Sequence, residues 1–249
     1  EKTIKKHWNE PAVKDYQQAG VTYGELAAEV EMNHILWCAA GLKRGDKISI
    51  NAKSCAGWAK TFMSIVSGGY IGVQLFDGYT PADTQQLVNH SDSVLLYTEK
   101  RLYDNMDIEN MPNLIGVIDV KTGDLLAFRN NFDSIYAKRQ QMFNEKHPNG
   151  LKQEDVYFED RDADDVCGIN YTSGSTGSPK GVMLTIRNFS ANAYSLSICR
   201  RWQLSKCFAI CTYLWFDLRR YRASLFRYAP YHIRFATYPT ISETCFKRS

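Results

Sequence analysis

The residues best suited to chemistry lie in one stretch, Tyr171 to Thr185, which reads YTSGSTGSPKGVMLT. Its first eleven residues include three glycines, three serines, two threonines and one lysine. Glycine lets a backbone approach a ligand closely because it carries no Cβ, and successive N–H groups with nearby hydroxyls bind phosphate oxygens. Lys180 adds a mobile positive charge. The stretch therefore predicts a loop that grips a polyphosphate.

Two other interpretations of this loop are less consistent with its surroundings. A flexible Gly/Ser linker has a similar composition, but apolar, strand-like residues flank the loop on both sides. The common P-loop requires Gly-Lys-Ser/Thr at the start of a helix, whereas here Lys180 precedes Gly181 and β-forming residues follow. We therefore expect the loop to join two strands.

The elements that must position the loop alternate between strand and helix. A Thr22–Glu25 capping box predicts the start of a helix that Gly41 ends, and Pro81 suits the first position of a later helix. The other expected elements are a turn at 43–46, strands at 47–52, 70–76, 94–97 and 114–118, helices at 56–67 and 82–90, and a last helix capped by Asn188 or Ser190. This alternation predicts parallel βαβ units in an α/β sheet.

Composition narrows the class of protein. The chain has 249 residues, of which 44% are hydrophobic and 23% charged, as is typical of globular proteins. It contains neither an 18-residue apolar span nor a recognisable signal peptide, so we expect a cytoplasmic location. The seven cysteines include no C-x-x-C pair, which favours free thiols. Residues 154–165 hold seven acids, which we interpret as a solvated surface segment because they lack metal-ligand spacing.

The sequence YTSGSTGSPKG resembles the signature loop of the adenylate-forming, AMP-dependent synthetase and ligase superfamily. That superfamily includes acyl-CoA synthetases, peptide-synthetase adenylation domains and luciferases. About ten specified positions, each matched at roughly 5–8% by chance, make an accidental match rarer than about one in 10^10. The segments VTYGELAAEV, LKRGDKISI and GGYIGVQLF follow the same order as in acyl-CoA synthetases and look most similar to the long-chain fatty-acid branch.

The resemblance implies a fold and an activity. Residues 1–198 would form the first half of the AMP-binding adenylation domain, with the doubly wound α/β sheets of an acyl-CoA synthetase N-terminal domain. Such enzymes activate a carboxylate with MgATP to an acyl-adenylate and pyrophosphate, and then transfer the acyl group to CoA. The partners implied are a fatty acid, ATP and CoA. The small C-terminal domain would be absent, so we expect this chain to be inactive alone.

The resemblance also implies a set of residues that bind ATP through its phosphates: Thr172, Ser173, Gly174, Ser175, Thr176, Gly177 and Lys180. The hydroxyls would donate to the β- and γ-phosphates, and the two glycines would allow close approach. Lys180, the one catalytic residue implied, would neutralise the departing pyrophosphate. No metal ligand is expected in this chain, because the magnesium-binding acid lies further on in the family. Ile186 stands where family members often carry histidine.

The last fifth of the chain differs from the rest. Residues 199–249 contain ten Lys/Arg and two acids, and hold 12 of the 32 aromatic residues. We interpret this atypical tail as the product of a shifted reading frame over roughly residues 213–232. Alternative splicing or natural divergence could produce the same amino-acid sequence. A basic amphipathic helix there would allow at most peripheral membrane association. We expect no nucleic-acid binding, because no recognised module surrounds the basic patch.

Three functions remain open from the sequence. The favoured one is a fatty-acid–CoA ligase of the AMP-forming type. The second is an amino-acid or aryl-acid adenylating domain. The third is an inactive fragment that only binds nucleotide phosphates.

Overall fold

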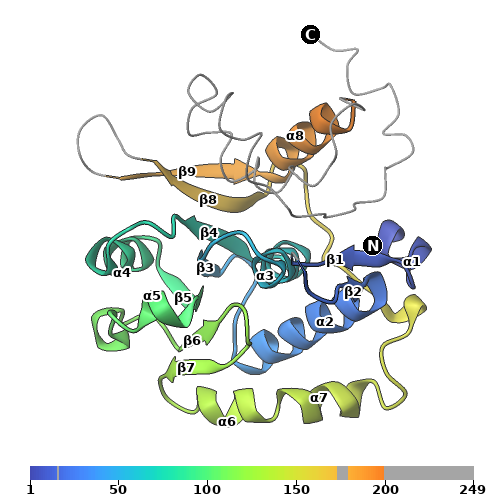
Figure 1. The fold of residues 1–249 in the computed structure, drawn as a ribbon, viewed down its shortest axis with the longest axis horizontal. Helices are drawn as coiled ribbons and strands as arrows, with labels where there is room; N and C mark the ends of the chain where they lie inside the picture. Colours follow the sequence, from blue (N-terminus) through green and yellow to red (C-terminus); the bar gives the residue numbers. More distant parts are fainter. Residues whose placement is uncertain (16, 173–178, 199–249) are drawn as a thin grey trace.

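This computed structural model describes residues 1–15, 17–172 and 179–198, with side chains through residue 192 (Figure 1). The atypical tail and its predicted frame shift lie outside the described residues. The described part is built on a seven-stranded sheet in the order β7-β6-β5-β3-β4-β8-β9. The strands of this sheet are β3 (Lys47–Asn51), β4 (Ile71–Leu75), β5 (Ser93–Thr98), β6 (Gly116–Asp119), β7 (Leu125–Phe128), β8 (Val166–Thr172) and β9 (Lys180–Thr185).

The five inner strands run parallel, and the two edge strands, β7 and β9, run antiparallel to their neighbours. A separate two-stranded antiparallel sheet, β1 (Pro11–Val13) and β2 (Val21–Thr22), lies near the N-terminus. The helices are α1 (Lys2–Lys6), α2 (Tyr23–Ala39), α3 (Ala56–Ser67), α4 (Pro81–His90), α5 (Lys100–Tyr103), α6 (Phe132–Ala137), α7 (Arg139–Lys146) and α8 (Ile186–Ile198), with 3-10 turns at η1 (Ile108–Asn110) and η2 (Gln153–Asp155).

Helices cover both faces of the sheet. Leu95 of β5 packs in a core cluster with Trp37 of α2, whereas the next residue, Leu96, packs in a second cluster with Leu87 of α4. Successive side chains of a strand point to opposite faces, so the two clusters mark the two sides of the sheet. This arrangement confirms the predicted doubly wound α/β fold.

The helix signals in the sequence act as predicted at α2. The Thr22 N–H donates to Glu25 Oε2 at 2.7 Å, and the Glu25 N–H donates to Thr22 Oγ1 at 3.2 Å. At the other end Gly41 has a φ of +83°, and its N–H donates to the Cys38 carbonyl. Only a residue without a Cβ adopts this conformation freely, so Gly41 ends the helix as expected. Helix α3 also spans the predicted residues 56–67.

The predicted cap of the last helix is wrong. Helix α8 begins at Ile186, and Thr185 caps it: the Asn188 N–H donates to Thr185 Oγ1 at 3.3 Å, while the Thr185 N–H donates to Asn188 Oδ1 at 2.9 Å. Asn188 is therefore the third helical residue in a reciprocal cap, and Ser190 lies inside the helix. Within the described ranges, no helix is long and apolar enough to cross a membrane.

Candidate functional site

The predicted phosphate loop is the tip of a β-hairpin. Thr172 ends β8, Lys180 begins β9, and the two residues face each other in the antiparallel register. This confirms that the loop joins two strands, and it distinguishes the loop from a P-loop, which opens a helix. Figure 1 shows the hairpin and α8 together at one end of the sheet, beyond β4.

The structure places only two of the seven expected phosphate-binding residues. Thr172 is half-buried, and Lys180 is exposed and forms no ion pair with any residue that the structure describes. Its ammonium is therefore available to an anion. Ser173, Gly174, Ser175, Thr176 and Gly177 lie outside the described residues, so their contacts with phosphate stay a prediction.

The position of the hairpin in the sheet suits a ligand site. Strand β8 runs parallel to β4, with Gly72 opposite Gly168 and Gln74 opposite Asn170. The loop after Thr172 therefore leaves from the carboxyl edge of the parallel strands. In open α/β sheets this edge is where ligands bind.

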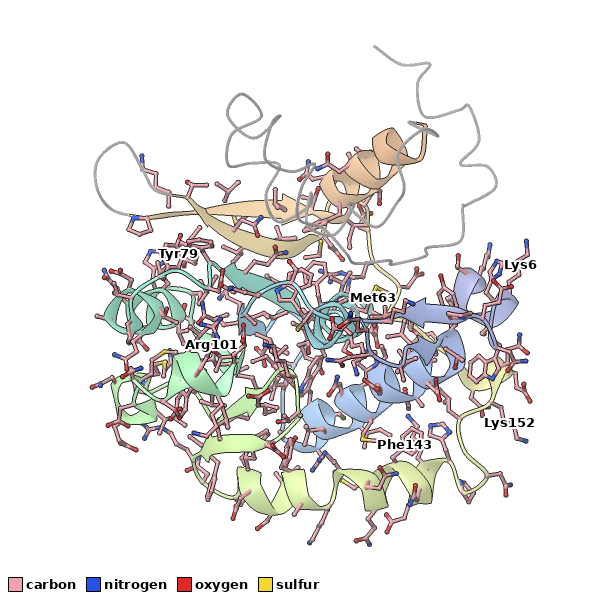
Figure 2. All side chains as sticks on the ribbon, viewed as in Figure 1. Lys6, Met63, Tyr79, Arg101, Phe143 and Lys152 are labelled. Carbon is pink, nitrogen blue, oxygen red and sulfur yellow. The ribbon has the colours of Figure 1, made fainter. Side chains whose placement is uncertain are left out.

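Tyr171, which precedes Thr172, holds the end of β8 against the body of the protein. Its side chain is only 5% exposed, and its hydroxyl lies 2.7 Å from Nδ1 of His90, the last residue of α4. The hydroxyl of Tyr79, labelled in Figure 2, donates to the Tyr171 carbonyl at 3.5 Å. Burial raises the pKa of the Tyr171 hydroxyl.

Gly181 allows β9 to lie close to that tyrosine. It faces Tyr171 across the hairpin, and a Cβ added at this position would lie 3.1 Å from Ile169 Cγ2 and 3.3 Å from Tyr171 Cε1. Both distances are tighter than ordinary contacts. The glycine after Lys180 thus serves packing within the hairpin.

The base of the hairpin is held by arginine side chains. Arg161 donates to the carbonyls of Tyr70 at 3.0 Å and Val166 at 2.7 Å, and Arg44 pairs with Asp165 at 2.7 Å. Asp164 accepts two bonds from Arg187, which lower the pKa of its carboxyl. Part of the acidic segment 154–165 therefore anchors β8 and α8. Among the described residues, no group of three or more His, Cys, Asp or Glu side chains could hold a metal ion.

The sequence reasoning missed a buried carboxylate at the ends of β5 and β6. Glu99 is 4% exposed; it accepts bonds from Lys121 Nζ at 2.7 Å, Arg101 Nε at 3.0 Å and the Lys53 N–H at 3.1 Å. Burial opposes its ionisation, but these bonds outweigh burial and lower the pKa of Glu99 to about 2. Arg101 is near Glu99 in the sequence, but Lys53 and Lys121 come from other segments and reach Glu99 only through the fold.

A comparison with protein families decides the lineage. The model of the family described as AMP-binding enzyme matches residues 1–226. The chain belongs to this AMP-binding enzyme family. The match covers the whole described part and continues into the tail, so the predicted recognition of an adenylate-forming protein is confirmed. The boundary at residue 198 and the reading-frame hypothesis stay predictions.

Known members of the AMP-binding enzyme family share both sequence and fold with this chain. The acyl-CoA ligase sidI of Aspergillus fumigatus is 28% identical over 182 residues, which cover 69% of this chain and 30% of sidI. A long-chain-fatty-acid-CoA ligase of Archaeoglobus fulgidus has a TM-score of 0.60 at 16% identity, over 81% of this chain and 38% of its own. An anthranilate CoA ligase bound to anthranoyl-AMP has a TM-score of 0.60 at 17% identity, over 76% and 34%.

These comparisons define what part of an AMP-binding enzyme the chain represents. It spans about a third of the length of the relatives it matches. The structural likeness, at these identities, establishes the fold: a parallel-rich sheet like that in the N-terminal domain of adenylate-forming ligases. The expected doubly wound α/β fold is therefore supported.

One cavity in the described part of the chain lies away from the hairpin. It has a volume of about 480 Å³ and is lined by residues of β1, β2 and the segment between them, including Ala12, Val13 and Val21. Its lining is mainly apolar, and none of the expected phosphate-binding residues contributes to it. The cavity and the hairpin are therefore separate features of the described structure.

Proposed function

We propose that the chain supplies the phosphate-gripping part of an AMP-forming acid–thiol ligase. The ligase uses ATP to convert the carboxylate of a fatty acid to an acyl-adenylate, and then transfers the acyl group to CoA. The observation that carries this proposal is the hairpin that brings Thr172 opposite Lys180 at the carboxyl edge of the sheet. Similarity of the signature loop and its flanking segments to the fatty-acyl branch supports the choice of acid. We place this activity in the cytoplasm.

The first reaction step needs no nucleophile from the protein. A carboxylate oxygen of the substrate attacks the α-phosphorus of ATP, the bond to the β-phosphate breaks, and pyrophosphate leaves with its negative charge. Hydroxyls and N–H groups of the loop, with Thr172 at its start, donate to the β- and γ-phosphates. Lys180 follows the departing pyrophosphate and neutralises its charge. Donors held in place before the reaction stabilise developing charge without reorganisation.

For Mg²⁺ and CoA we assign no binding residues in this chain. Mg²⁺ enters with the ATP phosphates, and we assign it no ligand among the described residues. In the second step the CoA thiol attacks the acyl carbon and AMP leaves. We assign this step to the two thirds of the relatives' length that this chain does not span.

Binding of MgATP to the chain tests the role of the loop. MgATP should raise the urea midpoint of unfolding, because a ligand that binds only the folded state stabilises it. The Thr176→Ala/Lys180→Ala double variant should lose this shift. Lys138→Ala is the matched control, since Lys138 is an exposed lysine at the junction of α6 and α7. A shift that survives the double variant would show that the loop is not the phosphate site.

Carboxylate-dependent exchange of labelled pyrophosphate into ATP tests the acid. Exchange that depends on fatty acids supports the proposal, and loss of Lys180 should slow it by about 10²–10³-fold. Dependence on an amino acid or aryl acid would instead support an adenylating domain of that class. Binding of MgATP without exchange for any acid would reduce the chain to a fragment that holds nucleotide phosphates.

A further inference from the structure

Two amide side chains lie next to each other on β4 and β8, close to the phosphate loop. Gln74 and Asn170 are partners in the parallel register between these strands. Neighbouring strands lie about 4.7–4.9 Å apart, and residues paired in this way point to the same face. Their positions in the chain are far apart, so the pair exists only because β8 docks beside β4.

Both amides have buried polar atoms without partners. Gln74 is 8% exposed, and neither its Nε2 nor its Oε1 forms a hydrogen bond in the described structure. The Oδ1 of Asn170 is likewise buried without a partner there. Buried polar groups are nearly always bonded, because leaving them unsatisfied costs stability. A pair of such groups side by side therefore points to a ligand that completes them.

The surroundings of the pair are apolar on one side. Two residues back along each strand, Gly72 and Gly168 also face each other. A Cβ at Gly72 would come within 3.0 Å of the Phe62 ring, and one at Gly168 within 3.0 Å of the Phe189 ring. The two phenylalanine rings pack with centroids 5.5 Å apart. The glycines thus make room for an aromatic wall that lies two residues along each strand from the amide pair.

The phosphate loop begins on the other side of the pair. Thr172 lies two residues beyond Asn170, so the two residues share a face of β8. Lys180 faces Thr172 from β9. From the wall to the loop, this face presents in turn aromatic rings, two amides, and the residues expected to hold ATP phosphates.

We propose that Gln74 and Asn170 form a subsite for a hydroxyl group on the acid substrate. The unpartnered atoms are one donor, Gln74 Nε2, and two acceptors, Gln74 Oε1 and Asn170 Oδ1. A hydroxyl accepts from the donor and gives its hydrogen to one acceptor. A carboxylate group would offer only acceptors, and an alkyl chain neither. The apolar body of the acid lies against Phe62 and Phe189.

This inference deepens the proposed function and rests on it, because it assumes that the ligand is an acid beside the phosphate loop. The substrate is accordingly a hydroxylated fatty acid, and the amide pair is the element that selects it. A site built to bond a hydroxyl rejects the analogue that lacks it, because the amides are then left unsatisfied.

The test compares octanoate with a positional series of hydroxyoctanoates, without nucleotide. Each acid is titrated against the 249-residue chain, and its affinity is obtained from the shift in the urea midpoint. At least one hydroxy isomer should bind about tenfold or more tightly than octanoate. If octanoate binds as well as the best hydroxy isomer, the subsite is wrong.

Replacement of the amides provides a second readout. Gln74→Met should raise the folded-to-unfolded ratio of the unliganded chain by about 5- to 30-fold, because it removes buried groups without partners. It should also abolish the preference for the hydroxy acid. Gln86→Met is the matched control on the exposed side of α4 and should change neither. A Gln74→Met chain that is less stable, or that keeps the preference, contradicts the proposal.

The outcomes separate this proposal from the proposed function. The MgATP shift and its loss in the Thr176→Ala/Lys180→Ala double variant report on the phosphate loop alone. If that shift is absent while hydroxy acids still bind through Gln74, the ligase function fails and the hydroxyl subsite stands. If the MgATP shift is present and the preference for hydroxy acids is absent, the hydroxyl subsite fails and the ligase function stands.

Discussion

Two pairs of neighbouring parallel strands bury polar side chains and satisfy them differently: β3 with β5 at the centre of the sheet, and β4 with β8 beside the hairpin. We call them the inner pair and the outer pair. In the inner pair, Ser49 Oγ lies 2.7 Å from Ser93 Oγ, and the Thr98 hydroxyl donates to the Asn51 carbonyl at 2.9 Å. In the outer pair the amides of Gln74 and Asn170 leave three atoms without a described partner.

This contrast separates two uses of buried polarity. In the inner pair the two serines bond to each other and Thr98 bonds to the Asn51 carbonyl, so these hydroxyls serve the stability and the register of the sheet. In the outer pair the amide atoms without partners reduce the stability of the fold, but they remain available to bond a ligand. The same kind of substitution should therefore have opposite effects in the two places.

The largest effect should come from the buried carboxylate at the end of β5. Because the pKa of Glu99 is about 2 in the fold and 4.5 in its ordinary state, its stabilising contribution is complete above about pH 5. It should be lost as the pH falls through 2, at a cost of about 3 kcal/mol in the free energy of unfolding. Urea unfolding between pH 5 and 2 measures this loss. In Glu99→Gln the free energy of unfolding should depend less on pH. If the variant and the original chain show the same pH dependence, Glu99 is not its cause.

Ser93→Ala should break the satisfied network of the inner strands. Ser93 bonds to Ser49 at 2.7 Å and to Ser91 at 2.8 Å, and all three side chains are buried. The variant leaves the Ser49 hydroxyl without this partner, so we expect a loss of about 2 kcal/mol in urea unfolding. Ser134→Ala, on the exposed side of α6, is the control. A gain in stability, as expected for Gln74→Met, would erase the contrast between the two regions.

Tyr171→Phe should destabilise the β8–β9 hairpin more than the inner pair, β3 and β5. It removes the hydroxyl that lies 2.7 Å from His90 Nδ1, at a cost of about 1 kcal/mol. Amide hydrogen exchange should accelerate in β8 and β9 and stay unchanged in β3 and β5. Tyr157→Phe, at an exposed tyrosine, should have no effect. Equal acceleration in all four strands would mean that the hairpin does not open separately.

The smallest effect should come from the cap of α8. Thr185→Ala removes the hydroxyl that accepts the Asn188 N–H, and we expect a loss of about 0.5–1 kcal/mol. Ser190→Ala should cost nothing, because Ser190 lies within the helix. Thermal unfolding of the two variants distinguishes the caps. A larger loss for Ser190→Ala would restore the cap that the sequence suggested.

Local signals explain what could be predicted. The capping box at Thr22 and the glycine at 41 each act over a few residues, and α2 was found near its true bounds. Helix α3 likewise spans its predicted residues. Helices α6 and α7 were missed because α7 has few apolar residues and depends on packing against α2. The N-terminal hairpin β1–β2 was missed as well, since its strands have only three and two residues.

The site was predictable only where one contiguous stretch carries it. The glycines, hydroxyl side chains and lysine between Thr172 and Lys180 are contiguous in the sequence, so the residue types alone predict a phosphate-binding loop. The contacts of Glu99 with Lys121 and of Gln74 with Asn170 join separate strands. These contacts depend on the strand order, which periodicity does not reveal.

The pairing of β8 with β4 also has a consequence for how the protein is made. Gly72 and Gly168 are neighbours in the sheet yet nearly one hundred residues apart in the chain. During synthesis at about 5–20 residues per second, β4 therefore waits for several seconds with one edge open before β8 emerges from the ribosome. Pairing over such a separation is slow. The loop between Thr172 and Lys180 is thus assembled late, and nascent chains that end before β8 expose the edge of β4 to chaperones or to other chains.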